Sequence, residues 1–127
     1  MMIYKILTDK DISNKISAAV TIGAPTNLFR QIELRPNMKP YYEKMFGGSD
    51  EDYINRSALF WSEKIIDSVP LLIMHGESDT SVSVEDSKDL CRKLTDNKHT
   101  NHRCVFYPNA EHPIREYKQE VYQNIIN

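Results

Sequence analysis

The chain has 127 residues, of which 40% are hydrophobic and 27% are charged, and these values are ordinary for one globular domain. Its formal charge is −2 and no long run carries a single sign, so we expect no binding to nucleic acid or to anionic lipid. No apolar stretch approaches the roughly 18 residues that a membrane-spanning helix needs. Residues 1–11 also lack the features of an export signal, and we therefore expect a cytoplasmic protein.

Three short apolar runs predict strands that are buried on both faces. They lie at residues 17–22, 69–74 and 103–107, and each ends at a turn. Residues 83–96 carry apolar side chains at helical spacing, which predicts an amphipathic helix between the second and third strands. The opposite side of this helix is polar, with Glu85, Asp86, Lys88 and Lys93. Strand, helix and strand in this order form a parallel crossover.

After the third run, Pro113 suits the start of a further helix, whose apolar side chains can pack on the sheet. The predicted class is therefore α/β, with about three parallel strands and flanking helices. Residues 27–67 interrupt the alternation, because prolines and glycines punctuate them. Residues 41–46 and 50–54 each fit a short helix, and residues 57–66 fit a segment that covers the sheet's edge or roofs a pocket.

The segment 27–67 is rich in aromatic residues, for which two interpretations remain. They either fill a small satellite core, which we favour, or line a substrate pocket. The residues concerned are Tyr41, Tyr42, Phe46, Tyr53, Phe60 and Trp61.

Two side chains suited to acid–base chemistry follow the second and third strands. Asp79 lies in the turn His75-Gly76-Glu77-Ser78-Asp79, and His112 ends the segment Asn109-Ala110-Glu111-His112. Catalytic groups of open α/β sheets gather beyond the carboxyl ends of the strands. An acid followed by a histidine matches the order of a hydrolytic triad, in which the carboxylate orients the histidine. The alternatives are a turn aspartate that caps the next helix and a surface histidine.

Three segments together resemble the C-terminal half of the prolyl oligopeptidase-type (S9) serine peptidase catalytic domain. They are Arg56-Ser57-Ala58-Leu59-Phe60-Trp61, the H-G-x-x-D-x-x-V turn that begins at His75, and Tyr107-Pro108-Asn109-Ala110-Glu111-His112. The turn alone is shared with dienelactone hydrolases and carboxylesterases, and the R-S-x-x-x-W element narrows the choice toward the peptidases. The resemblance implies a partial α/β-hydrolase fold, with Asp79 as triad acid and His112 as triad base. It also implies an acyl-enzyme mechanism on peptides or small esters.

The triad serine of this family lies in a G-x-S-x-G motif, which residues 1–127 do not contain. Residues 1–7 resemble the helix that follows this motif. We therefore expect residues 1–127 to be the C-terminal portion of the catalytic domain, without the nucleophile-bearing half and inactive alone. The family pattern also differs here at Ser83, where proline is common, and at Pro113, where glycine is usual.

Three functional hypotheses follow. The chain is a fragment of an S9-type hydrolase, a subunit that complements a separate N-terminal piece, or a non-catalytic binding module. An esterase or dienelactone hydrolase-like fragment is the alternative within the hydrolases. The strand at residues 17–22 would keep an unpaired edge, which invites an N-terminal half-domain or self-association. The sequence does not indicate the substrate.

The remaining candidate residues are interpreted as structural. His75 begins its turn, so we expect a packing or hydrogen-bonding side chain that shapes the loop. His99 and His102 have a spacing seen in metal sites, but no further ligand accompanies them, and we expect a solvated loop. Cys91 and Cys104 are too far apart for a CxxC motif, and free thiols are the simplest interpretation. No cofactor or metal is predicted.

Overall fold

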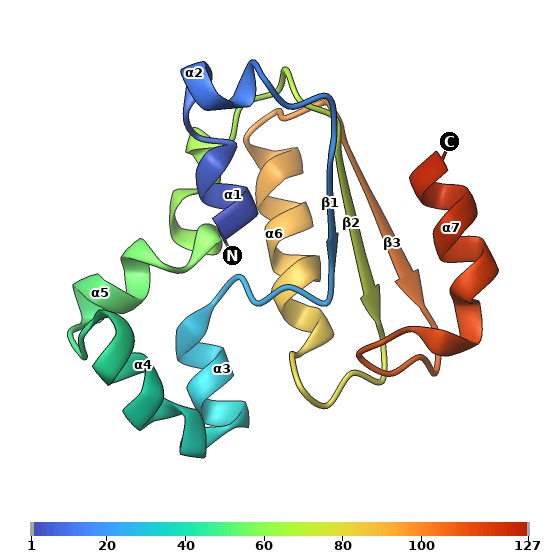
Figure 1. The fold of residues 1–127 in the computed structure, drawn as a ribbon. Coiled ribbons are helices and arrows are strands. Elements are labelled where there is room, and N and C mark those ends of the chain that lie inside the picture. The colour runs from blue at the N-terminus through green and yellow to red at the C-terminus, as the bar shows by residue number, and fades with distance from the viewer. Residues whose placement is uncertain (1, 127) are drawn as a thin grey trace.

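Three parallel strands in the order β1-β2-β3 form the centre of the computed structural model, which describes residues 2–126 (Figure 1). The strands are β1 (Ala19–Ile22), β2 (Leu71–Gly76) and β3 (His102–Tyr107). In register, Ala19 lies opposite Leu71, which in turn lies opposite His102. The α/β class and the three predicted strands are confirmed, with boundaries that differ by at most two residues.

Ten helical segments connect or flank the strands within residues 2–126. They are α1 (Met2–Ile6), α2 (Lys10–Ser13), α3 (Leu28–Leu34), η1 (Pro36–Met38), α4 (Lys39–Phe46), α5 (Asp50–Asn55), η2 (Ala58–Lys64), α6 (Val84–Asp96), η3 (Arg115–Tyr117) and α7 (Lys118–Ile126), where η marks a 3-10 helix. The helices predicted at 41–46, 50–54 and 83–96 are present. The last α-helix begins at Lys118, five residues after Pro113, because a loop and η3 come first. None of these helices is long and apolar enough to cross a membrane.

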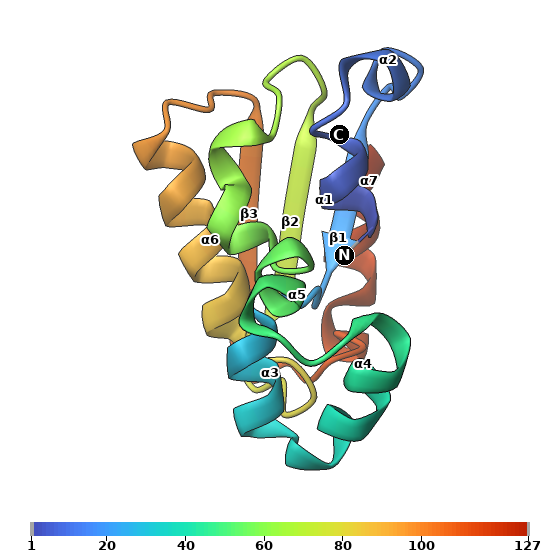
Figure 2. The ribbon, with the colours of Figure 1, turned by 90° about the vertical axis from the view of Figure 1, so that its left-hand side faces the viewer.

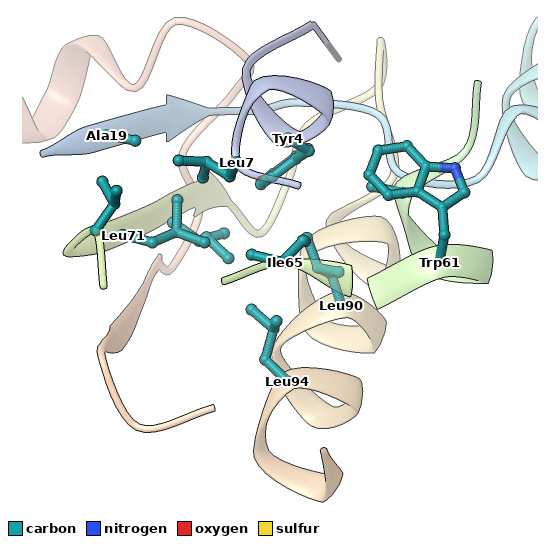
Figure 3. Packing of buried hydrophobic residues seen from close by; sticks show 11 residues of the cluster. Tyr4, Leu7, Ala19, Trp61, Ile65, Leu71, Leu90 and Leu94 are labelled. Carbon is teal, nitrogen blue, oxygen red and sulfur yellow. The ribbon is translucent and has the colours of Figure 1, made fainter. Parts of the chain in front are cut away.

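The main core lies between the sheet and the layer formed by α1, η2 and α6 (Figures 1 and 3). Figure 2 shows α6 and η2 side by side in front of β2 and β3. The segment 57–66 therefore covers a face of the sheet rather than its edge. A second, smaller cluster on the opposite face joins Leu72, Met74 and Tyr107 to the loop before α7 and to α7 itself.

Only the central strand is buried on both faces. All six residues of β2 are buried, but Val20 and Ile22 of β1 are 37% and 41% exposed. The expectation of full burial is wrong for β1 and for the half-buried β3, because both are edge strands. Val121 of α7 and Tyr117 of η3 pack on the cluster formed by side chains of β2 and β3, which contains no residue of β1. Position in the sheet thus decides burial where the apolar sequence does not.

A disulfide joins Cys91 of α6 to Cys104 of β3, with their Cα atoms 6.6 Å apart. The expectation of free thiols is therefore wrong. The two cysteines are 13 positions apart along the chain, and that spacing gives no sign of a pair. Helix α6 connects β2 to β3 and packs against the sheet beside β3. This packing brings the two cysteine side chains together.

Asp86 of α6 is buried, with an exposed fraction of 1%, although the helical pattern places it on the solvent side. Its Oδ2 accepts hydrogen bonds from the backbone N–H groups of Thr26 and Asn27, at 2.8 and 3.1 Å. Its Oδ1 pairs with Arg30 at 2.9 Å. The loop after β1 lies against the first turn of α6 and covers this carboxylate. Asp86 therefore ties α3 to α6.

His99 is also buried, at 7% exposure, so the solvated loop expected there is wrong. Its Nε2 lies 3.1 Å from the Ile66 carbonyl oxygen, and its Nδ1 lies 3.1 Å from His102 Nδ1. The carbonyl accepts only, so His99 Nε2 carries a proton. The pair fastens the loop before β3 to the loop before β2. No group of three or more residues within 2–126 has the arrangement of a metal site.

Replacing Asp86 tests the tie between α3 and α6. Asp86→Ala leaves two backbone N–H groups and the Arg30 guanidinium without their acceptor, so we expect the free energy of unfolding to fall by about 3–5 kcal/mol. Urea denaturation measures the change. The matched control is Glu85→Ala at the neighbouring exposed position, where we expect a change within about 0.5 kcal/mol. Equal effects of the two substitutions would contradict the role given to Asp86.

The histidine pair predicts a loss of stability in acid. Burial, followed by repulsion from His99, lowers the pKa of His102 below its ordinary value of 6.5. A lowered pKa in the folded state means that the stability contribution is complete above pH 6.5 and is lost as the pH falls through the folded-state value. We therefore expect His102→Gln to flatten the fall in melting temperature below pH 6.5. If the melting temperatures of the variant and of the parent chain fall equally as the pH is lowered below 6.5, this contribution is ruled out.

Candidate active site

Asp79 and His112, the two residues predicted as acid and base, lie in contact beyond the carboxyl ends of β2 and β3. His112 Nδ1 is 2.7 Å from Asp79 Oδ2. A carboxylate only accepts, so the proton of this hydrogen bond lies on Nδ1. The Asp79 side chain is fully buried, whereas that of His112 is 45% exposed. The arrangement therefore holds an accessible imidazole by a buried acid, with the proton of the contact on Nδ1 and Nε2 turned away from Asp79.

The turn after β2 holds the Asp79 carboxylate from its other side. Oδ1 accepts the backbone N–H groups of Ser81 and Val82, at 2.8 and 2.9 Å. This is an Asx turn, in which an aspartate closes its own loop. The N-cap of α6 is Ser83, whose Oγ accepts the N–H of Glu85, so Asp79 does not cap that helix. Both oxygens of Asp79 are thus occupied, and only Oδ2 contacts the histidine loop.

Gly76 allows the aspartate and histidine loops to meet. A Cβ atom at this position would lie 2.4 Å from the carbonyl oxygen of Ala110 and 2.5 Å from that of Glu111. Two backbone hydrogen bonds of 2.9 Å join the same loops, from Glu77 N to the Tyr107 oxygen and from Ser78 N to the Ala110 oxygen. Since any side chain at position 76 would press on backbone atoms, only glycine permits this approach.

Gly23, directly after β1, is a site residue that the sequence reasoning missed. Its φ of +62° lies in the left-handed region, and a Cβ atom there would lie 2.9 Å from His112 Cε1 and Nδ1. The imidazole ring therefore rests against the end of β1. A glycine that ends a buried strand often marks a close approach, and this was the available signal. The sequence pattern did not say which side chain would approach.

The loop that carries His112 has an unusual backbone. Asn109 and Ile114 have φ values of 59° and 51°. Asparagine tolerates this conformation, but it is strained for the β-branched Ile114. Ile114 is 2% exposed and belongs to the second core cluster, so its packing holds the strained turn. Pro113, which departs from the family pattern, therefore stands between the histidine and a buried anchor.

His75, the last residue but one of β2, is fully buried. Its Nε2 lies 2.9 Å from the Val82 carbonyl oxygen, and its Nδ1 lies 2.7 Å from Ser87 Oγ. The prediction of a hydrogen-bonding residue that shapes the loop is confirmed. Its Nε2 also lies 3.1 Å from Asp79 Oδ2.

Most of the aromatic side chains of residues 27–67 form a satellite cluster. Tyr53 stacks on Phe29 with ring centroids 5.4 Å apart and meets Phe46 edge-on at 5.5 Å. Trp61 instead belongs to the main core, where Figure 3 shows it beside Tyr4 and Leu90. Tyr41 is 64% exposed and is not part of either cluster. Tyr42 and Phe60 join the same cluster through ring contacts with Phe46 at 5.7 Å and with Phe29 at 5.8 Å. The favoured interpretation as a small core therefore holds for Tyr42, Phe46, Tyr53 and Phe60.

Known proteins resemble this chain both in sequence profile and in fold. The sequence profile of the prolyl oligopeptidase family matches residues 1–127. A puromycin-hydrolyzing peptidase of Mycobacterium tuberculosis superposes with a TM-score of 0.70 at 21% identity, over 84% of this chain and 16% of that chain. An acylaminoacyl peptidase of Pyrococcus horikoshii gives 0.70 at 17% identity, over 95% of this chain and 21% of that chain.

At these identities the likeness to the solved structures concerns the fold. The chain spans about a fifth or less of the length of these relatives. A comparison with curated protein sequences gave no significant match.

The contact at Gly76 predicts a specific sensitivity. Gly76→Ala forces two loop carbonyls apart, so we expect a loss of about 1–3 kcal/mol in the free energy of unfolding and a broken Asp79–His112 contact. Chemical denaturation and an experimental structure of the variant measure these effects. The control is Gly48→Ala, because a Cβ there would meet a flexible side chain, Glu43, at 3.1 Å. A Gly76→Ala variant with parental stability and an intact contact would refute the steric argument.

Proposed function

Because this chain belongs to the prolyl oligopeptidase family, we propose that Asp79 and His112 are the acid and base of a serine-hydrolase triad. The triad's nucleophile lies outside residues 1–127. The family consists of serine peptidases, and the reaction proposed for the completed site is hydrolysis of a peptide bond through an acyl-enzyme. Small esters are the alternative substrate class.

The 2.7 Å contact between Asp79 Oδ2 and His112 Nδ1 carries this proposal. With its proton held on Nδ1, the imidazole presents a lone pair on Nε2, which is the state that accepts the proton of an attacking hydroxyl. After the transfer the ring becomes a cation, and the buried carboxylate 2.7 Å away stabilises it. The leaving group then takes the proton from Nε2. His112 thus supplies the base, and Asp79 supplies the orientation of the ring and a stabilising negative charge. Neither residue forms a bond with an acyl group.

A nucleophile is required in addition, since a base without one performs no acyl transfer. Residues 1–127 contain no G-x-S-x-G sequence, and within residues 2–126 no hydrogen bond joins His112 Nε2 to a hydroxyl group. In the proposed function, a serine from a further segment of chain approaches this nitrogen.

The outer edge of β1 is the proposed place for the strand that brings the serine. Ala19 N donates to the carbonyl of Pro70, just before β2, and Gly23 N donates to that of Met74 in β2, so the backbone groups of Val20 and Ile22 point to the free edge. A parallel strand paired there would end beside Gly23, against which the His112 ring lies. The same free edge supports the competing proposal of self-association between copies of this chain.

Two other functional classes remain open to test. As a complementing subunit, the chain would bind a separate protein that carries the serine. As a non-catalytic module, it would keep the fold and the Asp79–His112 pair without any nucleophile.

Labelling with a fluorophosphonate probe in the native setting separates these classes. The chain is tagged at its C-terminus in its source organism and purified with whatever is covalently or non-covalently attached, and the labelled serine is located by mass spectrometry. We expect a labelled serine outside residues 1–127, and no labelling of recombinant residues 1–127 alone. A labelled serine within residues 1–127 would overturn the proposal, and an unlabelled native assembly would favour the non-catalytic module.

The same preparation tests the role of the acid. Asp79→Asn removes the carboxylate that holds the Nδ1–H form of His112, so we expect labelling to slow by about two to four orders of magnitude. Asp96→Asn, at an exposed position on α6, is the matched control and should label at the parental rate. An unchanged labelling rate in Asp79→Asn would remove Asp79 from the mechanism.

A further inference from the structure

His75, the buried histidine near the end of β2, contacts the candidate active site as well as its own loop. His75 Nε2 lies near two acceptor oxygens: it is hydrogen-bonded to the Val82 carbonyl at 2.9 Å, and it is 3.1 Å from Asp79 Oδ2, a close contact without hydrogen-bond geometry. Neither acceptor can donate a proton, so Nε2 carries one. Nδ1 of the neutral ring then accepts the hydroxyl proton of Ser87, whose Oγ lies 2.7 Å away. The surroundings therefore select a single tautomer of His75.

Four side chains consequently form one continuous polar row from α6 to the exposed imidazole. In order they are Ser87, His75, Asp79 and His112. Ser87, His75 and the Asp79 side chain are fully buried, so water does not compete for these contacts. In such surroundings each electrostatic contact is stronger than in water, and each lost partner is costly.

Asp79 Oδ2 accepts the Nδ1–H of His112 at 2.7 Å and lies in close electrostatic contact with His75 Nε2 at 3.1 Å. His75 acts on the same carboxylate by a second route, because it holds the carbonyl of Val82, whose N–H binds Oδ1. One buried ring therefore restrains both oxygens of the acid. Rotation of the Asp79 carboxylate away from His112 would move Oδ2 away from the positive end of the His75 N–H.

We propose that His75 is a positioning residue for the Asp79–His112 pair, and that its Nε2–H directs Asp79 Oδ2 toward His112 and so maintains the Nδ1–H tautomer of His112. The row transfers no proton, since His75 keeps its hydrogen on Nε2 throughout. Ser87 anchors the row by fixing the tautomer of His75. This inference deepens the proposed function, on which its catalytic meaning rests.

The test reads the tautomers of both rings and needs no turnover, so its failure is distinct from failure of the proposed function. Nitrogen shifts, measured by NMR through couplings to the carbon-bound ring protons, show which nitrogen carries the proton. At about pH 8.5, above the ordinary titration range of histidine, we expect Nε2–H in His75 and Nδ1–H in His112. A parent chain with His75 in the Nδ1–H form would overturn the proposal at once.

Two substitutions of His75 form a matched pair. Glutamine places its amide nitrogen near the position of Nε2, and asparagine places its own near Nδ1, so only the first can reach Asp79. We expect His112 to keep its Nδ1–H form in His75→Gln. In His75→Asn we expect a shift of His112 toward the Nε2–H form. The same His112 tautomer in both variants would contradict the proposal.

Ser87→Ala separates positioning from simple destabilisation. It removes the partner of His75 Nδ1 but leaves Nε2 facing its two acceptors. We therefore expect a lower melting temperature with an unchanged His112 tautomer. If Ser87→Ala shifts His112 as much as His75→Asn does, the effect belongs to general loosening and the positioning role is wrong. Should His75→Asn fail to fold, the parent tautomers still decide, and a shift of His112 toward the Nε2–H form in His75→Gln would overturn the proposal.

Discussion

The close approach of two loops at Gly76 is the constraint on which the site depends. With no side chain at this position, the backbone after β2 lies against the carbonyl oxygens of Ala110 and Glu111. Asp79 and His112 stand 33 residues apart in the sequence, and neither loop alone brings them together. Parallel pairing of β2 with β3 aligns the two strand ends, and Gly76 then allows the final contact. Asp79 and His112 can contact each other because the backbones of their two loops lie against each other at Gly76.

The site has one part that is buried away from water and one part that is accessible to it. Asp79 lies behind the turn that it closes, with His75 and Ser87 behind it in turn, and all of these side chains are removed from water. His112 lies in front, on a loop whose packing is secured by Ile114. A charge held in this way costs desolvation, which is offset only when its hydrogen-bond partners are complete. The occupied oxygens of Asp79 meet that condition.

The sheet has the opposite character at β1. Within residues 2–126 no further strand pairs with its outer edge, and Val20 and Ile22 expose apolar side chains there. These two features occur at the same strand whose last residue precedes Gly23 and the His112 ring. The outer edge of β1 is therefore adjacent to the Asp79–His112 contact. This juxtaposition explains why the proposed function looks for its nucleophile at that edge.

The sequence by itself determined the strands, the principal helix, the family resemblance and the two candidate residues. Apolar runs that end at turns, and a helical repeat between two of them, are local patterns that tertiary contacts here reinforce. The patterns failed where a side chain's surroundings came from a distant segment. Asp86 and His99 read as solvent-facing but are buried by the loops after β1 and before β2.

The tertiary structure alone decided which groups touch. The pairing of Cys91 with Cys104, the seat of His112 against Gly23 and the contact of His75 with Asp79 all join segments that are neighbours only after the strands have aligned. Periodicity specifies which face of an element is apolar, but the distance between two elements depends on their packing. For this reason the sequence indicated the acid and the histidine, and the fold supplied the geometry that relates them.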